Sequence, residues 1–168
     1  VKLAEIELEW KKSTTYTVLK RLCEREIFQN NSGIVTSLIK KEDYFTSSNM
    51  RTQIHYVTWQ PEGDIVAIVQ IVHGMNDFIG RYDRFASYLA NKGIMVVGHD
   101  MLGHGQSVRN QDELGYFFEE HEVYLVKDVE KLRNIISKQY PDKPYYILGH
   151  SMGSFLTTLY IQQYGLHL

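Results

Sequence analysis

The residues best suited to chemistry are a serine and its flanking glycines, in the run Gly149-His150-Ser151-Met152-Gly153. A strand-like apolar run, Tyr145–Leu148, precedes it, and apolar residues at helical spacing follow it. Such a tight turn from strand to helix needs small residues on both sides and projects the serine above the sheet. The Met152 amide would then lie at a helix N-terminus, where the dipole favours negative charge. The pattern predicts a nucleophilic serine, and an ordinary glycine-rich turn is the alternative.

Apolar residues from Ile54 onward recur in a pattern that alternates between strands and helices. The helix that follows Ser151 is expected to turn Phe155, Leu156 and Leu159 inward. Strands that alternate with helices of this length predict a mostly parallel, three-layer α/β sheet. The expected strands are Ile54–Trp59, Ile65–His73, Ile94–Gly98 and Tyr145–Leu148, and the expected helices are Arg81–Asn91, 123–139 and Ser151–Tyr164.

The first part of the chain has a different pattern. Residues 1 to about 25 show helical spacing of apolar residues, with Ser13 as a candidate N-cap. Two short β-prone runs follow, Ile27–Gln29 and Ile34–Leu38. The run Asn30-Asn31-Ser32-Gly33 separates them with residues that tolerate positive φ, which predicts a β-hairpin.

The amino-acid composition excludes few classes of protein. The 168 residues are 43% hydrophobic and 23% charged with a net charge of −2, which is ordinary for a soluble globular protein and gives no global case for nucleic-acid or membrane binding. Cys23 is the only cysteine, so we expect no intramolecular disulfide and a reducing, cytoplasmic location. Neither a transmembrane segment nor a secretory signal is visible. We expect no cofactor and no metal site.

Five motifs occur in a fixed order between Phe45 and Gly153, and together they resemble one family. From roughly Tyr44 onward the chain resembles the N-terminal half of the monoacylglycerol lipase/lysophospholipase group of α/β-hydrolases, also called the serine aminopeptidase-like hydrolases. The motifs are Phe45-Thr46-Ser47-Ser48-Asn49, His73-Gly74-Met75, Gly80-Arg81-Tyr82, Gly103-His104-Gly105-Gln106-Ser107 and Gly149-His150-Ser151-Met152-Gly153.

The resemblance implies a role for each matching residue in the hydrolysis of acyl esters such as monoacylglycerols or lysophospholipids. Ser151 would be the nucleophile, in a turn formed by Gly149, His150 and Gly153. The backbone amides of Met75 and Met152 would form the oxyanion hole. His73 and Gly74 would support the loop that carries Met75.

The resemblance also implies a catalytic acid and base that these residues do not supply. In this fold the acid and then the histidine follow the serine along the chain. Only 17 residues follow Ser151, none is Asp or Glu, and their one histidine is His167. A serine without a base is a poor nucleophile, so we expect the chain to be inactive as an enzyme. The other histidines are not expected to serve as the base. His73, His99, His104 and His150 would support loops, and His55 and His121 would be surface or packing residues.

A second resemblance concerns the first part of the chain. Residues Trp10 to Arg25, with the hairpin that follows, resemble the recognition helix and wing of the penicillinase-repressor (BlaI/MecI/CopY) family. The helix would contact phosphates and base edges, although without the rest of that motif and its dimerisation region we expect weak binding. The alternative is a small helical hairpin with a solvated charged face. The candidate DNA-binding residues are Lys11, Lys12, Ser13, Thr14, Thr17, Lys20 and Arg21.

These observations predict two domains and leave three hypotheses. Residues 1–44 would be a partial winged-helix segment, and residues 45–168 an α/β-hydrolase domain truncated after the nucleophile helix. The chain is a serine hydrolase represented by its N-terminal half, a DNA-binding regulator with a hydrolase-like appendage, or an inactive fusion of two gene fragments. Val1 opens without a cap inside a helical pattern, which favours the third hypothesis.

Overall fold

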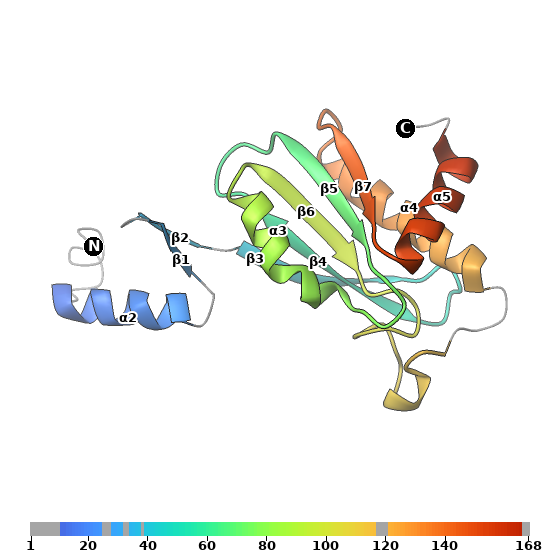
Figure 1. The fold of residues 1–168 in the computed structure, drawn as a ribbon, viewed down its shortest axis with the longest axis horizontal. Coiled ribbons are helices and arrows are strands. Elements are labelled where there is room, and N and C mark those ends of the chain that lie inside the picture. The colour runs from blue at the N-terminus through green and yellow to red at the C-terminus, as the bar shows by residue number, and fades with distance from the viewer. Residues whose placement is uncertain (1–10, 25–27, 32–33, 38, 117–120, 166–168) are drawn as a thin grey trace. The chain divides into compact units, whose positions relative to one another are not determined.

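The computed structural model describes residues 11–24, 28–31, 34–37, 39–116 and 121–165 (Figure 1). The chain divides into two compact units, with the boundary between Ile39 and Lys40. Each unit is described by itself.

The first unit contains one described helix and a hairpin. Helix α2 spans Lys12–Glu24, and strands β1 (Phe28–Asn31) and β2 (Ile34–Ser37) pair antiparallel, with Phe28 opposite Ser37 and Asn31 opposite Ile34. The predicted hairpin is confirmed, whereas the helix expected over residues 1–10 lies outside the described residues.

The prediction of Ser13 as N-cap is wrong. The N-cap carbonyl accepts the first bond of a helix, and here the amide of Thr15 donates to the carbonyl of Lys11 at 3.1 Å. Ser13 is the second residue of α2, and its carbonyl accepts from the Thr17 hydroxyl at 3.0 Å.

The second unit is built on a mixed five-stranded sheet (Figure 1). Its strands are β3 (Ile39–Thr46), β4 (Gln53–Gln60), β5 (Ala67–Val72), β6 (Ile94–His99) and β7 (Tyr145–Gly149), in the spatial order β3-β4-β6-β5-β7. Strand β5 pairs parallel with both β6 and β7, and β4 pairs antiparallel with β6. The predicted strands are therefore present, but parallel pairing is limited to β5, β6 and β7.

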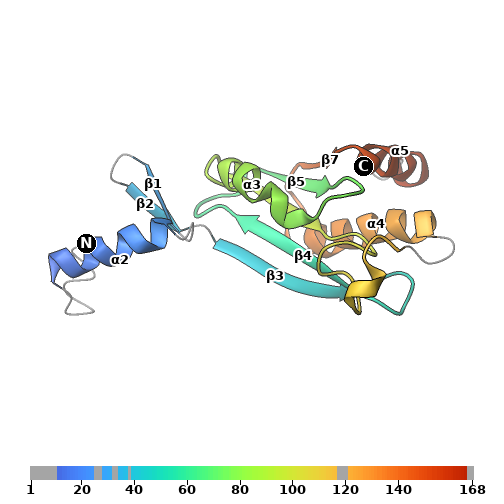
Figure 2. The same cartoon turned by 60° about the horizontal axis from the view of Figure 1, so that its bottom comes forward.

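Helices cover both faces of this sheet (Figure 2). The short 3-10 helix η1 (Ile79–Tyr82) leads into α3 (Asp83–Ala90) over one face, where Ala86, Ala90 and Ile79 pack on Val57, Trp59 and Val96. Helices α4 (His121–Gln139) and α5 (Met152–Tyr164) lie over the other face, with Leu125, Val129, Leu132, Leu156 and Tyr160 in the core. A second 3-10 helix, η2, spans Gln111–Glu113. This is the predicted three-layer arrangement.

The predicted inward face of α5 is partly wrong. Leu156 is buried, but Phe155 is 76% exposed and Leu159 is 42% exposed. The buried stripe runs through Gly153, Leu156 and Tyr160, because residues spaced by three and four share one side of a helix. Across the part of the chain with described structure, no helix combines the length and apolar character that a membrane crossing requires.

Candidate active site

Ser151 lies in a sharp turn between the end of β7 at Gly149 and the start of α5 at Met152. Its backbone has φ 53° and ψ −120°, and positive φ is uncommon for a residue with a side chain. Such strain persists only where the surrounding structure imposes it, and it concentrates at functional sites. The hydroxyl is displayed at a helix N-terminus, as the glycine spacing predicts.

Packing explains the two glycines of the turn. A Cβ atom on Gly149 would lie 2.5 Å from the carbonyl oxygen of Gly153. A Cβ atom on Gly153 would overlap the carbonyl of Val72, at the end of the neighbouring strand β5. Any side chain at either position would push α5 off the sheet, so the spacing of these glycines is a steric requirement of the turn.

The loop after β5 lies directly against the serine. A Cβ atom on Gly74 would be 3.2 Å from the Cβ of Ser151 and 3.3 Å from His150 Nδ1. The amide of His150 also donates to the carbonyl of Val72 at 3.0 Å. The structure thus brings the loop residues His73, Gly74 and Met75 to the turn that carries Ser151 and Met152.

His73 joins this loop to a second one. Its ring is fully buried, and its Nε2 atom accepts from the Met101 amide at 3.0 Å. The Nδ1 atom therefore carries the proton and donates to the carbonyl of Gly74 at 2.7 Å. Burial, reinforced by the nearby His104, lowers the pKa of His73 despite the bond to Gly74. A neutral ring with both nitrogens bonded positions backbone and does not serve as a base.

The glycine-rich loop after β6 encloses a buried carboxylate, that of Asp100. Asp100 accepts from the amides of Ile79 at 2.7 Å and Gln106 at 2.9 Å, and its Oδ2 lies 2.8 Å from His55 Nδ1. Burial acts to raise the pKa of Asp100, but these hydrogen bonds outweigh it and hold the pKa below its usual value. Gly105 has φ 48°, and a Cβ there would collide with this carboxyl group.

Two further histidines, His104 and His99, are buried. His104 is buried, and its Nδ1 lies 2.9 Å from the carbonyl of Leu102 within its own loop. His99 is fully buried, and within the described residues neither ring nitrogen has a hydrogen-bond partner. His167 and the side chain of His121 lie outside the described part of the chain.

One acidic residue near the serine was missed by sequence reasoning, and it is Asp77. Its nearly buried carboxylate accepts from the Tyr82 hydroxyl at 2.9 Å and pairs with Arg81 Nε at 3.2 Å. Its Oδ2 lies 3.8 Å from Nδ1 of His150, whose ring is exposed beside Ser151. The only sequence signal was the motif Gly80-Arg81-Tyr82, which supplies both partners of Asp77.

The serine itself is not activated by its surroundings. Among residues 11–24, 28–31, 34–37, 39–116 and 121–165, no histidine or carboxylate forms a hydrogen bond with the Ser151 hydroxyl. The side chain of Met75 is exposed and that of Met152 is half-buried. The arrangement places an exposed serine hydroxyl beside the N-terminus of α5 and the loop that follows β5.

Comparisons with known proteins agree with this geometry. The serine aminopeptidase, S33 family model matches residues 63–168. Monoglyceride lipase of Mus musculus is 38% identical over 101 residues, which cover 60% of this chain and 32% of the relative. Monoacylglycerol lipase of Mycolicibacterium smegmatis is 31% identical over 112 residues, which cover 67% of this chain and 38% of the relative. The chain therefore spans about a third of the length of these curated relatives.

Solved structures show the same fold. A carboxyl esterase from Bacillus coagulans, solved in complex with glycerol, superposes with a TM-score of 0.71 at 29% identity, over 79% of this chain and 43% of the esterase. A lipase in its open form superposes with a TM-score of 0.68 at 29% identity, over 77% of this chain and 42% of the lipase. The second unit therefore has the fold of an α/β-hydrolase.

Proposed function

Because the chain belongs to the serine aminopeptidase S33 family of α/β-hydrolases, we propose that Ser151 is the nucleophile of a site for acyl esters. The observation that carries the proposal is the strained turn at Ser151 with the Gly74 loop packed against it. Relatives with the names monoglyceride lipase and carboxyl esterase support an acyl ester, with a monoacylglycerol or lysophospholipid as the substrate class.

The chemistry assigns roles to the backbone around the serine. Attack of Ser151 Oγ on the ester carbonyl creates a tetrahedral intermediate whose oxygen carries negative charge. The amides of Met75 and Met152 would donate to this oxygen, and the N-terminus of α5 favours the same charge. His73 and Gly74 would hold the Met75 amide in place, since the His73 ring is bonded to the backbone on both sides.

We expect the rate of ester turnover to be limited by the lack of a base. Deprotonation of the serine needs a base within hydrogen-bond reach that an acid orients. No such base contacts Ser151 among the described residues, and no acidic residue follows it in the sequence. We therefore propose that these 168 residues alone turn over esters hardly above background.

Acylation of the serine, rather than turnover, is the direct test of its role. We expect a reactive ester such as p-nitrophenyl acetate to acylate Ser151 slowly, and peptide mapping by mass spectrometry to locate the adduct. Ser154 is a matched control, because it is an exposed serine in the first turn of α5 and its hydroxyl donates to the carbonyl of Gly149 at 3.0 Å. Acylation of Ser154 as fast as Ser151 would contradict the proposed nucleophile.

The second candidate function is weak DNA binding by the first unit. The observation that favours it is the expected order of a helix followed by an antiparallel hairpin, in α2, β1 and β2. The side chain of Lys12 lies outside the described part. The other candidate contacts are all exposed, and they are Lys11, Ser13, Thr14, Thr17, Lys20 and Arg21.

A further inference from the structure

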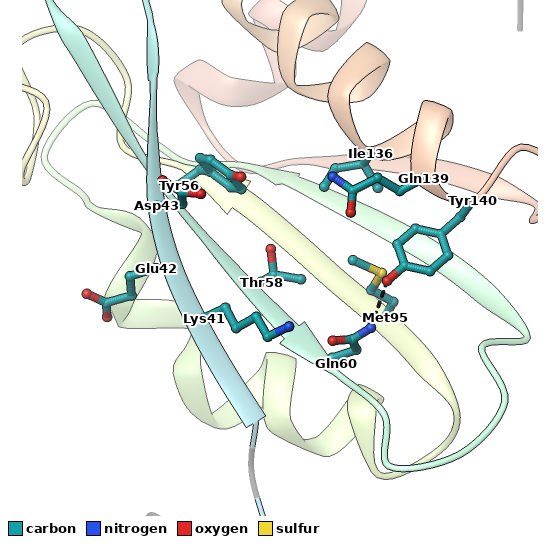
Figure 3. Close-up of a pocket in the computed structure, with 10 residues that line it drawn as sticks. All are labelled: Lys41, Glu42, Asp43, Tyr56, Thr58, Gln60, Met95, Ile136, Gln139 and Tyr140. Carbon is teal, nitrogen blue, oxygen red and sulfur yellow. Dashed lines mark hydrogen bonds between the residues drawn. The ribbon is translucent and has the colours of Figure 1, made fainter.

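A pocket of about 350 Å³ opens on the α4 side of the sheet, between β3, β4, β6 and the end of α4 (Figure 3). Met95, the second residue of β6, lines it, so the pocket lies toward the amino ends of the parallel strands. Ser151 follows the carboxyl end of β7, which is parallel to β5 and β6 in direction. The pocket is therefore separate from the nucleophile.

The floor of the pocket is apolar and its rim is fixed. Met95 and Ile136 are each 2% exposed and form the floor with the nearly buried Thr58. Near one end, Gln60 Nε2 donates to the Tyr140 hydroxyl at 2.7 Å, which ties the edge of β4 to the end of α4. The walls are thus held by the sheet and by a helix that packs on it.

Two opposite charges stand along one wall. Lys41 and Asp43 are two residues apart on β3 and therefore point to the same face, toward the pocket in Figure 3. Glu42 between them also lines the pocket, but its carboxylate points to the other face, where Lys40 lies at 2.9 Å and His55 at 3.5 Å. Residues at this spacing are roughly 6.6 Å apart along a strand.

The two charges have different neighbours. Within the described residues, no carboxylate lies within ion-pair distance of Lys41, whose ammonium points toward Gln60 in Figure 3. Asp43 Oδ1 accepts from the Tyr44 amide at 2.8 Å, and its carboxylate lies beside the Tyr56 ring. Burial and then the charge of Asp43 raise the pKa of Tyr56, so this phenol stays neutral. The pocket is positive at the Gln60 end and negative at the Tyr56 end.

We propose that this pocket binds a small zwitterion, with an ammonium and a carboxylate separated by a short apolar chain. The carboxylate pairs with Lys41, and the ammonium pairs with Asp43 beside the Tyr56 ring. The apolar chain covers Met95 and Ile136. A simple anion would be attracted by Lys41 but repelled by Asp43, and a simple cation would be attracted by Asp43 but repelled by Lys41.

Three matched probes test the proposal by NMR titration of the 168-residue protein. The probes are 5-aminopentanoate, which carries both charges, pentanoate, which carries only the anion, and pentylamine, which carries only the cation. We expect 5-aminopentanoate to bind at least about tenfold more tightly than either analogue, with shifts at the Met95 methyl group. Lys41→Met and Asp43→Asn should each remove that advantage, because each deletes one charge of the pair.

Control variants separate the pocket from general charge effects. Lys92→Met and Asp64→Asn remove the same charges from exposed residues that do not line the pocket, and they should leave the affinity unchanged. Equal binding of pentanoate or of pentylamine overturns the proposal, as does loss of affinity in the control variants. Absence of shifts at Met95 with 5-aminopentanoate at about 50 mM overturns it as well.

Discussion

The imidazole of His73 accepts a hydrogen bond from the amide of Met101 at 3.0 Å, although the two residues are 28 positions apart in the chain. The same ring donates to the carbonyl of Gly74, so one buried side chain fixes the loop beside Ser151 to the loop after β6. The loop beside Ser151 is therefore held to the loop after β6 through both nitrogens of one histidine ring.

Replacement of His73 is expected to destabilise the fold. His73→Ala removes two hydrogen bonds and a buried ring, which should lower the free energy of unfolding by about 3 kcal/mol. Urea unfolding followed by circular dichroism measures it. His150→Ala, at an exposed ring next to the same serine, is the control and should cost less than about 0.5 kcal/mol. Similar losses in both variants would contradict the assigned role.

Substitution of Gly153 tests the steric requirement of the turn. Gly153→Ala places a methyl group into the carbonyl of Val72, so α5 must shift, and we expect a loss of about 3 kcal/mol in unfolding free energy. Gly63→Ala is a matched control, because a Cβ at Gly63 meets no atom within 4 Å. Unfolding curves that coincide for the two variants would show that the turn relaxes more easily than its contacts imply.

His99 should make stability depend on pH. Burial lowers its pKa from 6.5 to about 3, with the nearby His73 adding to the effect. The folded state thus binds fewer protons than the unfolded state below pH 6.5, and its stability falls as pH decreases from 6.5 toward 3. When the pH is lowered from 7 to 4.5, the free energy of unfolding should therefore fall by about 2 kcal/mol less in His99→Leu than in the unsubstituted protein. Equal losses in urea unfolding would show that His99 takes up its proton while folded.

Sequence reasoning located the serine turn because its requirements are local. Gly149, Gly153 and the strand and helix on either side lie within about 20 consecutive residues, and the contacts that demand glycine involve the turn itself and adjacent β5. The core strands were found for the same reason, since a continuous apolar run is readable without knowledge of its neighbours.

What sequence reasoning missed depends on contacts between distant residues. Strand β3 contains the charged run Lys40-Lys41-Glu42-Asp43, which lacks the apolar residues that predict a strand. Its strand conformation depends on contacts with other residues, such as the ion pairs of Lys40 with Glu42 and Asp83. The Asp100 carboxylate is hydrogen-bonded to His55, which is 45 residues away in the sequence, so this contact could not be predicted from either residue's neighbours. Phe155 was expected to face inward with Leu156 and Leu159, but the close packing of Gly153 on β5 orients α5 so that Phe155 is exposed.

DNA binding by the first unit is expected to be weak and sensitive to salt. Lys20 and Arg21 are exposed on α2. Lys20 Nζ lies 4.0 Å from Glu24 Oε1, and this carboxylate competes with DNA phosphates for the ammonium group. Titration of a labelled duplex at two salt concentrations should show affinity that falls steeply with salt and further in Lys20→Ala/Arg21→Ala. Tight, sequence-specific binding near physiological salt would show that the helix and hairpin suffice for recognition.

Ester hydrolysis by the 168 residues alone is expected to be barely detectable. Loss of the base from a serine triad costs on the order of a million-fold in turnover, and an oxyanion hole alone retains roughly a thousand-fold over water. His150 is adjacent to Ser151 in the sequence, but its ring is exposed and lies 3.8 Å from Asp77, beyond a direct hydrogen bond. A short-chain nitrophenyl ester assay measures turnover, with Ser151→Ala as the control. Turnover within about tenfold of an intact family member, abolished by that substitution, would contradict the prediction and identify His150, oriented by Asp77, as the base to test next.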